Sequence, residues 1–320
     1  MPTSHSRRQL LGSATMALTS ATLAATMTQT VKAAEQSNRP ADEPFGYCLN
    51  MSTISGANLS IVQQIDVASK AGYHAIEPWV RDIDAYVKKG NLLKDLAKRL
   101  SDAGIAVIDA IAFANWVVDD DAQRNAGFEQ MKRDMETVAQ IGAKHIAAPP
   151  MGATNNANLD LHKAAERYRA LLELGDKTGV HPLLELWGHS KCLNRLPDVA
   201  FVAIDSARPD ASMLLDIYHL HKGGTDYASL RQINGGNLHL IHMNDFPATP
   251  DRAHITDAHR VYPGDGVAPF KQILTDLRDN GFRGYLSLEL FNRDYWKESP
   301  EKVATTGIEK MREVVRKSLA

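Results

Sequence analysis

The fold is decided by four short stretches in the second half of the chain: HPLLELWG (181–188), SMLLDIYH (212–219), LHLIHMND (238–245) and GYLSLELF (284–291). Each stretch is mostly apolar or β-prone, as buried strands are, and each carries an acidic or imidazole side chain near its end. Those side chains are Glu185, Asp216, His242 and Glu289. Because a buried carboxylate without a partner costs several kcal/mol, three carboxylates and a histidine at equivalent strand ends predict a shared divalent cation.

Similar apolar runs alternate with amphipathic segments along most of the chain. The sequence predicts strands at 45–50, 75–79, 106–112, 145–149, 182–187, 212–218, 238–244 and 285–291. It predicts helices that include 61–71, 92–103, 128–141, 161–178 and 269–280, most of which end at a glycine. Such alternation gives parallel strands joined by right-handed crossovers, and eight units over about 250 residues are typical of a TIM barrel. We therefore expect an α/β protein with a single (β/α)8 barrel and its site at the C-terminal strand ends.

An open, doubly wound sheet is the alternative fold. No Gly-x-Gly-x-x-Gly follows the first predicted strand, so a dinucleotide site has no support. The connection from His242 to Pro269 is longer than the others and is rich in Pro, Asp, His and Arg. Long loops in compact domains are usually functional, so we expect this loop beside the metal site.

Composition narrows the class of protein. The chain has 320 residues, 44% of them hydrophobic, and a net charge of −2, which fits a globular protein with a sizeable core. Without a Lys/Arg cluster it has no electrostatic footprint for nucleic acid or anionic lipid, so a small neutral partner is favoured. Cys48 and Cys192 are expected to be unpaired buried thiols, with one disulfide left open if the protein is exported.

The N-terminus predicts export. Ser6-Arg7-Arg8-Gln9-Leu10-Leu11 resembles a twin-arginine signal, and it precedes a weakly apolar, charge-free stretch over residues 10–31. Val31-Lys32-Ala33 offers a small-residue cleavage site. We therefore expect a signal peptide at 1–33, a linker at 34–44 and the barrel at 45–320, in a periplasmic or otherwise exported protein. Thr and Ser dilute the apolar stretch too much for a stable membrane anchor.

The predicted ligand set has its own chemistry. Two Glu, one Asp and one His form a hard, mostly oxygen site that suits Mn²⁺, Mg²⁺ or Co²⁺ better than a structural zinc with thiolates. A cation held by a carbonyl and its neighbouring hydroxyl stabilises an enediolate, and paired carboxylates can move the proton. Return of the proton gives epimerisation or isomerisation, whereas loss of a β-hydroxyl makes the same site a hydro-lyase.

These residues also resemble a known family. The sequences Asp-Ile-Tyr-His (216–219), His-Met-Asn-Asp (242–245) and Arg-Val-Tyr-Pro-Gly (260–264) are similar to those of the xylose isomerase-like TIM barrel superfamily, often labelled sugar phosphate isomerase/epimerase, over about residues 45–315. By resemblance to its ketose 3-epimerases, Glu185 and Glu289 would bind the metal and form the catalytic acid/base pair, while Asp216 and His242 complete the metal shell. The metal would be Mn²⁺, with Mg²⁺, Co²⁺ or Zn²⁺ as alternatives. A homo-oligomer is also implied.

Further residues are candidates for substrate contacts. The resemblance implies that His219 and Arg260 hold substrate oxygens. Glu77 could orient the substrate or support a ligand, or form a salt bridge with Arg81. Trp116 could stack on a sugar face or pack at the barrel rim. His189 stands where the 3-epimerases carry a further Glu, which leaves the substrate open.

One motif points to another branch of the superfamily. Asp257-Ala258-His259 resembles the additional metal ligands of endonuclease IV, so Asp257 and His259 are candidates for a further metal site. That branch also needs His residues at the ends of the second and third strands, where this chain has Glu77 and Asp109 or Asn115. A nuclease is therefore disfavoured.

The leading hypothesis is a divalent-metal-dependent isomerase or epimerase of an unphosphorylated sugar or keto-sugar, since no Gly-rich loop or basic cluster forms a phosphate cradle. The alternative is a hydro-lyase of the same site, either an inosose-type dehydratase or a keto-sugar hydratase. A third hypothesis is an exported sugar-binding barrel without turnover.

Overall fold

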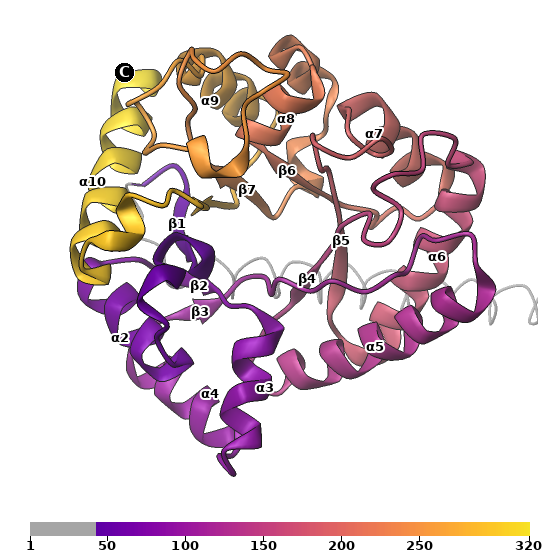
Figure 1. Cartoon of the computed structure of the whole chain (residues 1–320), viewed down its shortest axis with the longest axis horizontal. Helices are drawn as coiled ribbons and strands as arrows, with labels where there is room; N and C mark the ends of the chain where they lie inside the picture. The colour runs from indigo at the N-terminus through magenta and orange to yellow at the C-terminus, as the bar shows by residue number, and fades with distance from the viewer. Residues whose placement is uncertain (1–42) are drawn as a thin grey trace, which may run out of the picture. The chain divides into compact units, whose positions relative to one another are not determined.

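Eight parallel strands form the centre of the protein (Figure 1). The computed structural model describes residues 43–320, so the expected signal peptide and all but the last two residues of the expected linker lie outside the described residues. The strands are β1 (Gly46–Asn50), β2 (Ala75–Glu77), β3 (Ala106–Val107), β4 (His145–Ala148), β5 (His181–Glu185), β6 (Met213–Asp216), β7 (Leu240–Met243) and β8 (Tyr285–Leu288). Their order is β3-β2-β1-β8-β7-β6-β5-β4, as in a barrel opened between β3 and β4.

A hydrogen bond crosses that gap. The Ala147 amide on β4 donates to the Ala110 carbonyl, three residues beyond β3, at 2.9 Å. Helices surround the strands: α2 (Ile61–Ala71), α3 (Val80–Lys88), α4 (Leu93–Asp102), α5 (Asp121–Ala139), α6 (Leu161–Thr178), α7 (Leu196–Asp205), α8 (Ile217–Gly223), α9 (Phe270–Asp279) and α10 (Pro300–Leu319). The prediction of a single-domain α/β TIM barrel is confirmed for the part of the chain that is described.

Several boundaries differ from those predicted, each for a local reason. Asp216 ends β6 early because its side chain accepts the His219 amide at 2.7 Å and caps α8, so residues 217–218 are helical. The helix expected from residue 128 begins at Asp121, because Asp120 caps it by accepting the Gln123 amide. The strand expected over 106–112 keeps regular pairing only at its start.

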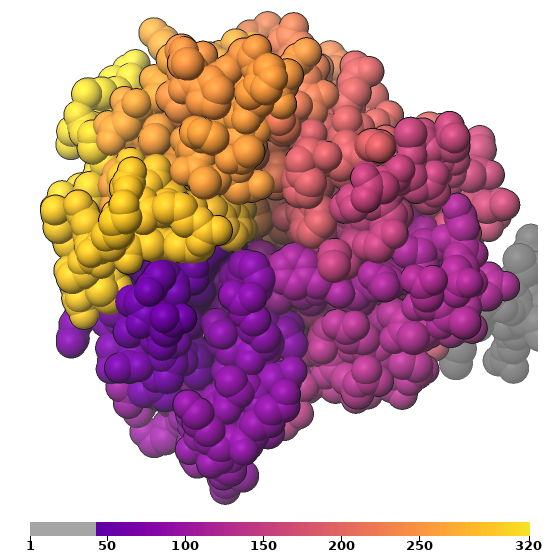
Figure 2. All heavy atoms as spheres, in the orientation of Figure 1, coloured from indigo at the N-terminus to yellow at the C-terminus, as the bar shows by residue number. Residues whose placement is uncertain are grey.

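The connection from β7 to α9 is the long loop expected from the sequence, and it contains the short 3-10 helix η4 (Asp257–His259). Asp245 holds this loop, because its carboxylate accepts the backbone amides of Gly264, Gly266 and Ala268 at 2.9–3.0 Å. Figure 2 shows that the face of the molecule seen there is hollowed near its centre, where purple, orange and yellow segments meet.

Two further features belong to the barrel. Cys48 and Cys192 are both free and buried, as expected from their spacing. None of the helices between residues 43 and 320 has the length and apolar character that a bilayer-crossing helix requires.

Candidate metal centre

Alternation along the strands places the polar residues of the candidate site. An apolar layer inside the barrel includes Cys48, Ala75, Ala147, Leu183, Leu214, Leu240 and Tyr285, one residue from each of seven strands. Side chains two residues apart on a strand face the same way. The next inward layer, toward the C-terminal ends, therefore contains Asn50, Glu77, Glu185, Asp216, His242 and Ser287. Glu289 follows Ser287 by two residues, so it faces inward at the end of β8.

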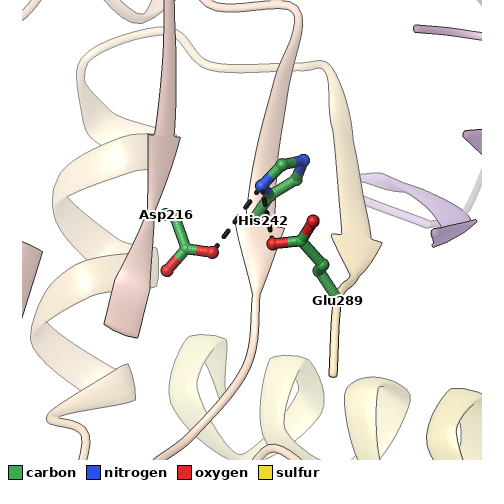
Figure 3. Close-up of side chains that lie close together, drawn as sticks. All are labelled: Asp216, His242 and Glu289. Carbon is green, nitrogen blue, oxygen red and sulfur yellow. Dashed lines mark ion pairs between the residues drawn. The ribbon is translucent and has the colours of Figure 1, made fainter. Parts of the chain in front are cut away.

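Asp216, His242 and Glu289 converge on one point from three adjacent strands (Figure 3). One potential ligand atom of each residue lies within 4.8 Å of those of the other two. The Nδ1 atom of His242 is 3.2 Å from Glu289 Oε2 and 3.6 Å from Asp216 Oδ2. All three side chains are buried, so two carboxylates and an imidazole face each other away from bulk water.

Glu77 fixes the orientation of the His242 ring from the side opposite Asp216 and Glu289. Its Nε2 atom is 2.9 Å from Glu77 Oε1, while the other Glu77 oxygen accepts hydrogen bonds from Asn50 and Ser287. A carboxylate behind a histidine is typical of metal sites, because it holds the proton on the far nitrogen and leaves the near one to bind the ion. The near atom, His242 Nδ1, is buried and makes no hydrogen bond. The residues present therefore fit a divalent cation.

A buried arginine completes the charge balance of the centre. Arg260 Nη1 donates to Asp216 Oδ2 at 2.9 Å and to Glu289 Oε2 at 2.7 Å. Although burial opposes ionisation, the Arg260 guanidinium holds the pKa of Asp216 well below its usual range. Burial also opposes the charged form of His242, yet Glu289 and Glu77 raise its pKa well above the usual value. Positive charge is thus strongly favoured at this point.

Glu185 lies apart from the three converging residues. It ends β5 and is 4% exposed, but it does not belong to the group of ligand atoms within 4.8 Å. Burial raises the pKa of Glu185 to about 8; the His242 charge opposes that rise, and Glu289 adds to it. The structure therefore brings together three of the four residues expected as ligands. The fourth, Glu185, is a carboxyl that can hold a proton, at the end of the strand next to β6.

The expected substrate residues of the long loop and of α8 adjoin the centre. Arg260 Nη2 contacts His219 Nε2 at 3.1 Å and Asp257 Oδ1 at 2.5 Å. His259 instead binds Thr256, whose amide and hydroxyl lie 3.0 and 2.9 Å from its Nδ1. Within residues 43–320, neither Asp257 nor His259 belongs to a group of metal-ligating side chains, so the structure does not assemble the further metal site.

Three other candidates occupy different positions. Trp116 is wholly buried, donates its indole N–H to the Pro149 carbonyl at 2.7 Å and packs on Tyr168, which makes it a core residue instead of a sugar platform. Glu77 is also wholly buried against His242, a geometry that favours support of the ligand over contact with substrate. His189 is exposed, and its ring lies 5.4 Å from that of His219.

Some residues of the centre were missed in the sequence. Asn244 donates to Asp216 Oδ2 at 2.9 Å and accepts the Tyr218 amide at 2.8 Å, which ties the β7 end to α8. Asn50 bridges Glu77 and Glu289, at 2.8 and 3.2 Å. Asn50 ends β1 and Asn244 directly follows β7, so the position of each at a strand end is a signal in the sequence, although neither is acidic or an imidazole.

Fold and site together define a (β/α)8 barrel with a buried carboxylate and imidazole centre at its C-terminal mouth. The sequence matches the family described as xylose isomerase-like TIM barrel over residues 65–314. The chain belongs to this family, as its motifs predicted.

Known proteins similar to this chain include enzymes of carbohydrate metabolism. It is 28% identical to inosose isomerase of Bacillus velezensis over 84% of this chain and 97% of that protein. It is 23% identical to 3-dehydro-D-guloside 4-epimerase of Escherichia coli over 62% of this chain and 77% of that protein. Among solved structures, the IOLI protein with a binding zinc atom superposes with a TM-score of 0.79 at 24% identity, over 85% of this chain and 99% of that one.

Proposed function

We propose that the protein is a divalent-metal-dependent isomerase or epimerase of an unphosphorylated keto-sugar or cyclic polyol ketone. The observation that carries the proposal is the Nδ1 atom of His242. It is buried, makes no hydrogen bond, faces the carboxylates of Asp216 and Glu289 and is held in place from behind by Glu77. Such an arrangement provides a metal-binding nitrogen whose orientation is fixed before the ion arrives.

When bound there, a divalent cation would act as a Lewis acid toward a carbonyl and its neighbouring hydroxyl. We assign the proton transfers to Glu185 and Glu289, which come from strands on either side of β6 and β7. One carboxylate removes the proton beside the carbonyl, and the other returns a proton to the resulting enediolate. The raised pKa of Glu185, about 8, keeps that carboxyl able to carry a proton near neutral pH.

His219 and Arg260 are assigned to the substrate's oxygens. Burial lowers the pKa of His219 to about 3, so the imidazole is neutral and can accept or donate a hydrogen bond. Arg260 already contacts both Asp216 and Glu289, which places its fixed positive charge beside the reacting groups. A neutral donor and a charged donor side by side suit a hydroxyl and a developing oxyanion.

The substrate class rests on the relatives. An inosose isomerase and a 3-dehydro-D-guloside 4-epimerase are named for carbohydrate ketones without phosphate. The centre agrees with this, because the carboxylates of Asp216, Asp257 and Glu289 already balance the charge of Arg260, which leaves that guanidinium without excess positive charge for a phosphate dianion. We therefore place inososes and 3-keto-sugars ahead of sugar phosphates. A hydro-lyase of the same site is the second candidate.

The test is conversion by the metal-loaded protein. The protein is incubated with Mn²⁺ and a set of inososes, 3-keto-glycosides and ketoses, and the products are followed by NMR and mass spectrometry. A rearranged product of unchanged mass supports the isomerase or epimerase. A product that differs by one water would assign the lyase, and binding without conversion would leave only a sugar-binding barrel.

A further inference from the structure

Three aromatic side chains form a connected row just beyond the carboxyl ends of strands that carry none of the three converging ligands. The ring centroids of Trp79 and Phe113 are 5.0 Å apart, and those of Phe113 and Trp187 are 6.1 Å apart. These residues follow β2, β3 and β5, whereas the converging metal ligands lie on or beside β6, β7 and β8. We call Trp79, Phe113 and Trp187 the aromatic arc.

The backbone explains why the arc lies above the carboxylate layer. Trp79 and Trp187 each come two residues after an inward carboxylate, Glu77 and Glu185, and continue the same inward row. The strand-like bridge between Trp79 and Ile111 fixes the segment after β3, and Phe113 follows Ile111 by two residues. All three rings are only partly buried, unlike the core residue Trp116. Because the Arg81 guanidinium covers one face of Trp79, the ring surface left for a ligand is chiefly that of Phe113 and Trp187.

The arc is connected to the reacting groups at one end. Trp187 follows Glu185 by two residues in the same inward row, and its ring centroid is 5.1 Å from that of His189. His189 in turn packs against His219, which contacts Arg260. At the other end, the Arg81 guanidinium lies over the Trp79 ring, 3.9 Å from its centroid.

The barrel mouth thus has an ionic side and an apolar side. A six-membered ring that carries hydroxyl groups has the same division, since its oxygens project from the rim while its C–H bonds cover the faces. Aromatic rings pack on such C–H faces, and the ionic side binds the oxygens. An open-chain sugar presents no fixed C–H face and loses more conformational freedom on binding.

We propose that the aromatic arc is the wall that binds the C–H face of the substrate, and that it selects cyclic polyhydroxy ketones over open-chain ketoses. This inference rests on the proposed function, whose substrate class it narrows. Phe113 is the best residue for a test, because Trp187 stands two residues from Glu185 in the same inward row, and its loss would also disturb the proton-transferring carboxyl.

The experiment compares Phe113→Leu with the wild type and with Phe201→Leu, the same change on the exposed face of α7. The substrates are pentahydroxycyclohexanone and erythrulose, a ketose too short to close a six-membered ring. We expect the wild type to prefer the ring, and Phe113→Leu to lower the kcat/KM ratio of ring to chain by about tenfold, mainly through KM for the ring. Phe201→Leu should keep the wild-type ratio, and Mn²⁺ affinity should be the same in all three proteins.

An unchanged ratio, or an equal loss on both substrates, would overturn the assignment of the wall. If the wild type converts neither substrate, the proposed function fails, and binding of myo-inositol followed by tryptophan fluorescence decides the inference separately. Quenching that Phe113→Leu weakens and Phe201→Leu does not would support the wall. Absent or equal quenching would contradict it.

Discussion

Glu77 shows how a single residue outside the ligand set can control the metal centre. Its carboxylate holds His242 Nε2 at 2.9 Å and is itself fixed by Asn50 and Ser287. Burial opposes ionisation of this group, but the His242 charge lowers its pKa, so Glu77 stays a carboxylate beside the ring. Its negative charge makes His242 a better electron donor toward an ion.

We therefore predict that Glu77→Gln weakens Mn²⁺ binding by about 10- to 100-fold, because the amide keeps the shape but not the charge. Isothermal titration calorimetry measures the affinity, and circular dichroism checks that the barrel is folded. Glu173→Gln, the same change at an exposed position of α6, is the control and should bind Mn²⁺ as the wild type does. Wild-type affinity in Glu77→Gln would show that the carboxylate does not support a ligand.

At the scale of secondary-structure elements, Asp245 connects the end of β7 to the loop that carries Arg260. Its side chain accepts four backbone amides, those of Phe246, Gly264, Gly266 and Ala268. The loop approaches closely, since a Cβ on Gly266 would clash with Asp245 Oδ1. Without this carboxylate, the loop's amides would lose their acceptors.

Asp245→Ala should accordingly lower the free energy of unfolding by about 2–4 kcal/mol, as expected for the loss of a buried charged acceptor. Urea denaturation of the metal-free protein gives the value. Asp251→Ala removes a largely exposed carboxylate from the same loop and should change stability little. Equal effects of the two substitutions would mean that the loop is not held by Asp245.

The strands and helices were largely predictable, because alternation of apolar runs and capped helices is a local property of the sequence. The direction in which side chains point beyond the strand ends could not be predicted in this way. For Trp116, both stacking on a sugar and packing at the barrel rim were open; the chain turns it into the core, while Phe113 in the same segment joins the aromatic arc. Three of the four expected ligands converge because period-two alternation continues to Asp216, His242 and Glu289. The bridging position of Arg260 depends on a long loop whose course no local pattern determines.

At the scale of the whole molecule, the floor of the barrel contains three close histidines. His145 and His181 begin β4 and β5, and His239 precedes β7; the His145 and His239 ring centroids are 4.1 Å apart. Burial is the largest cause that lowers the pKa of His145 well below its usual value, and the neighbouring His239 lowers it further. The unfolded chain therefore binds a proton below about pH 6.5 that the folded protein does not, and stability falls with decreasing pH.

We predict that His145→Asn reduces this loss between about pH 7.5 and about pH 5, because an amide does not titrate and its nitrogen can still donate to the Ile108 carbonyl, which His145 Nδ1 contacts at 2.8 Å. Urea unfolding in the presence of a chelator separates this effect from metal binding. His162→Asn, the same change at an exposed position of α6, is the matched control with which the slope of His145→Asn is compared. The prediction is wrong if His145→Asn and the wild type lose stability in parallel.

Export concerns the whole chain as well and remains a prediction, since residues 1–33 lie outside the described residues. If the arginine pair is a twin-arginine signal, the periplasmic fraction of expressing bacteria should contain a shortened protein that begins near residue 34. Replacing Arg7 and Arg8 by Lys should retain the full-length chain in the cytoplasm. Equal periplasmic amounts of both proteins would contradict the signal.

The central claim is that Glu185 moves a proton at a substrate carbon beside a metal held by Asp216, His242 and Glu289. The most direct measurement is NMR of pentahydroxycyclohexanone and a 3-keto-glucoside in D₂O with the Mn²⁺-loaded wild type, followed by removal of Mn²⁺ before the spectra are recorded. We predict deuterium at the carbon next to the carbonyl, and loss of this exchange in Glu185→Gln and in chelator-treated protein. Exchange that persists in Glu185→Gln at the wild-type rate, or that is independent of the metal, would contradict the account.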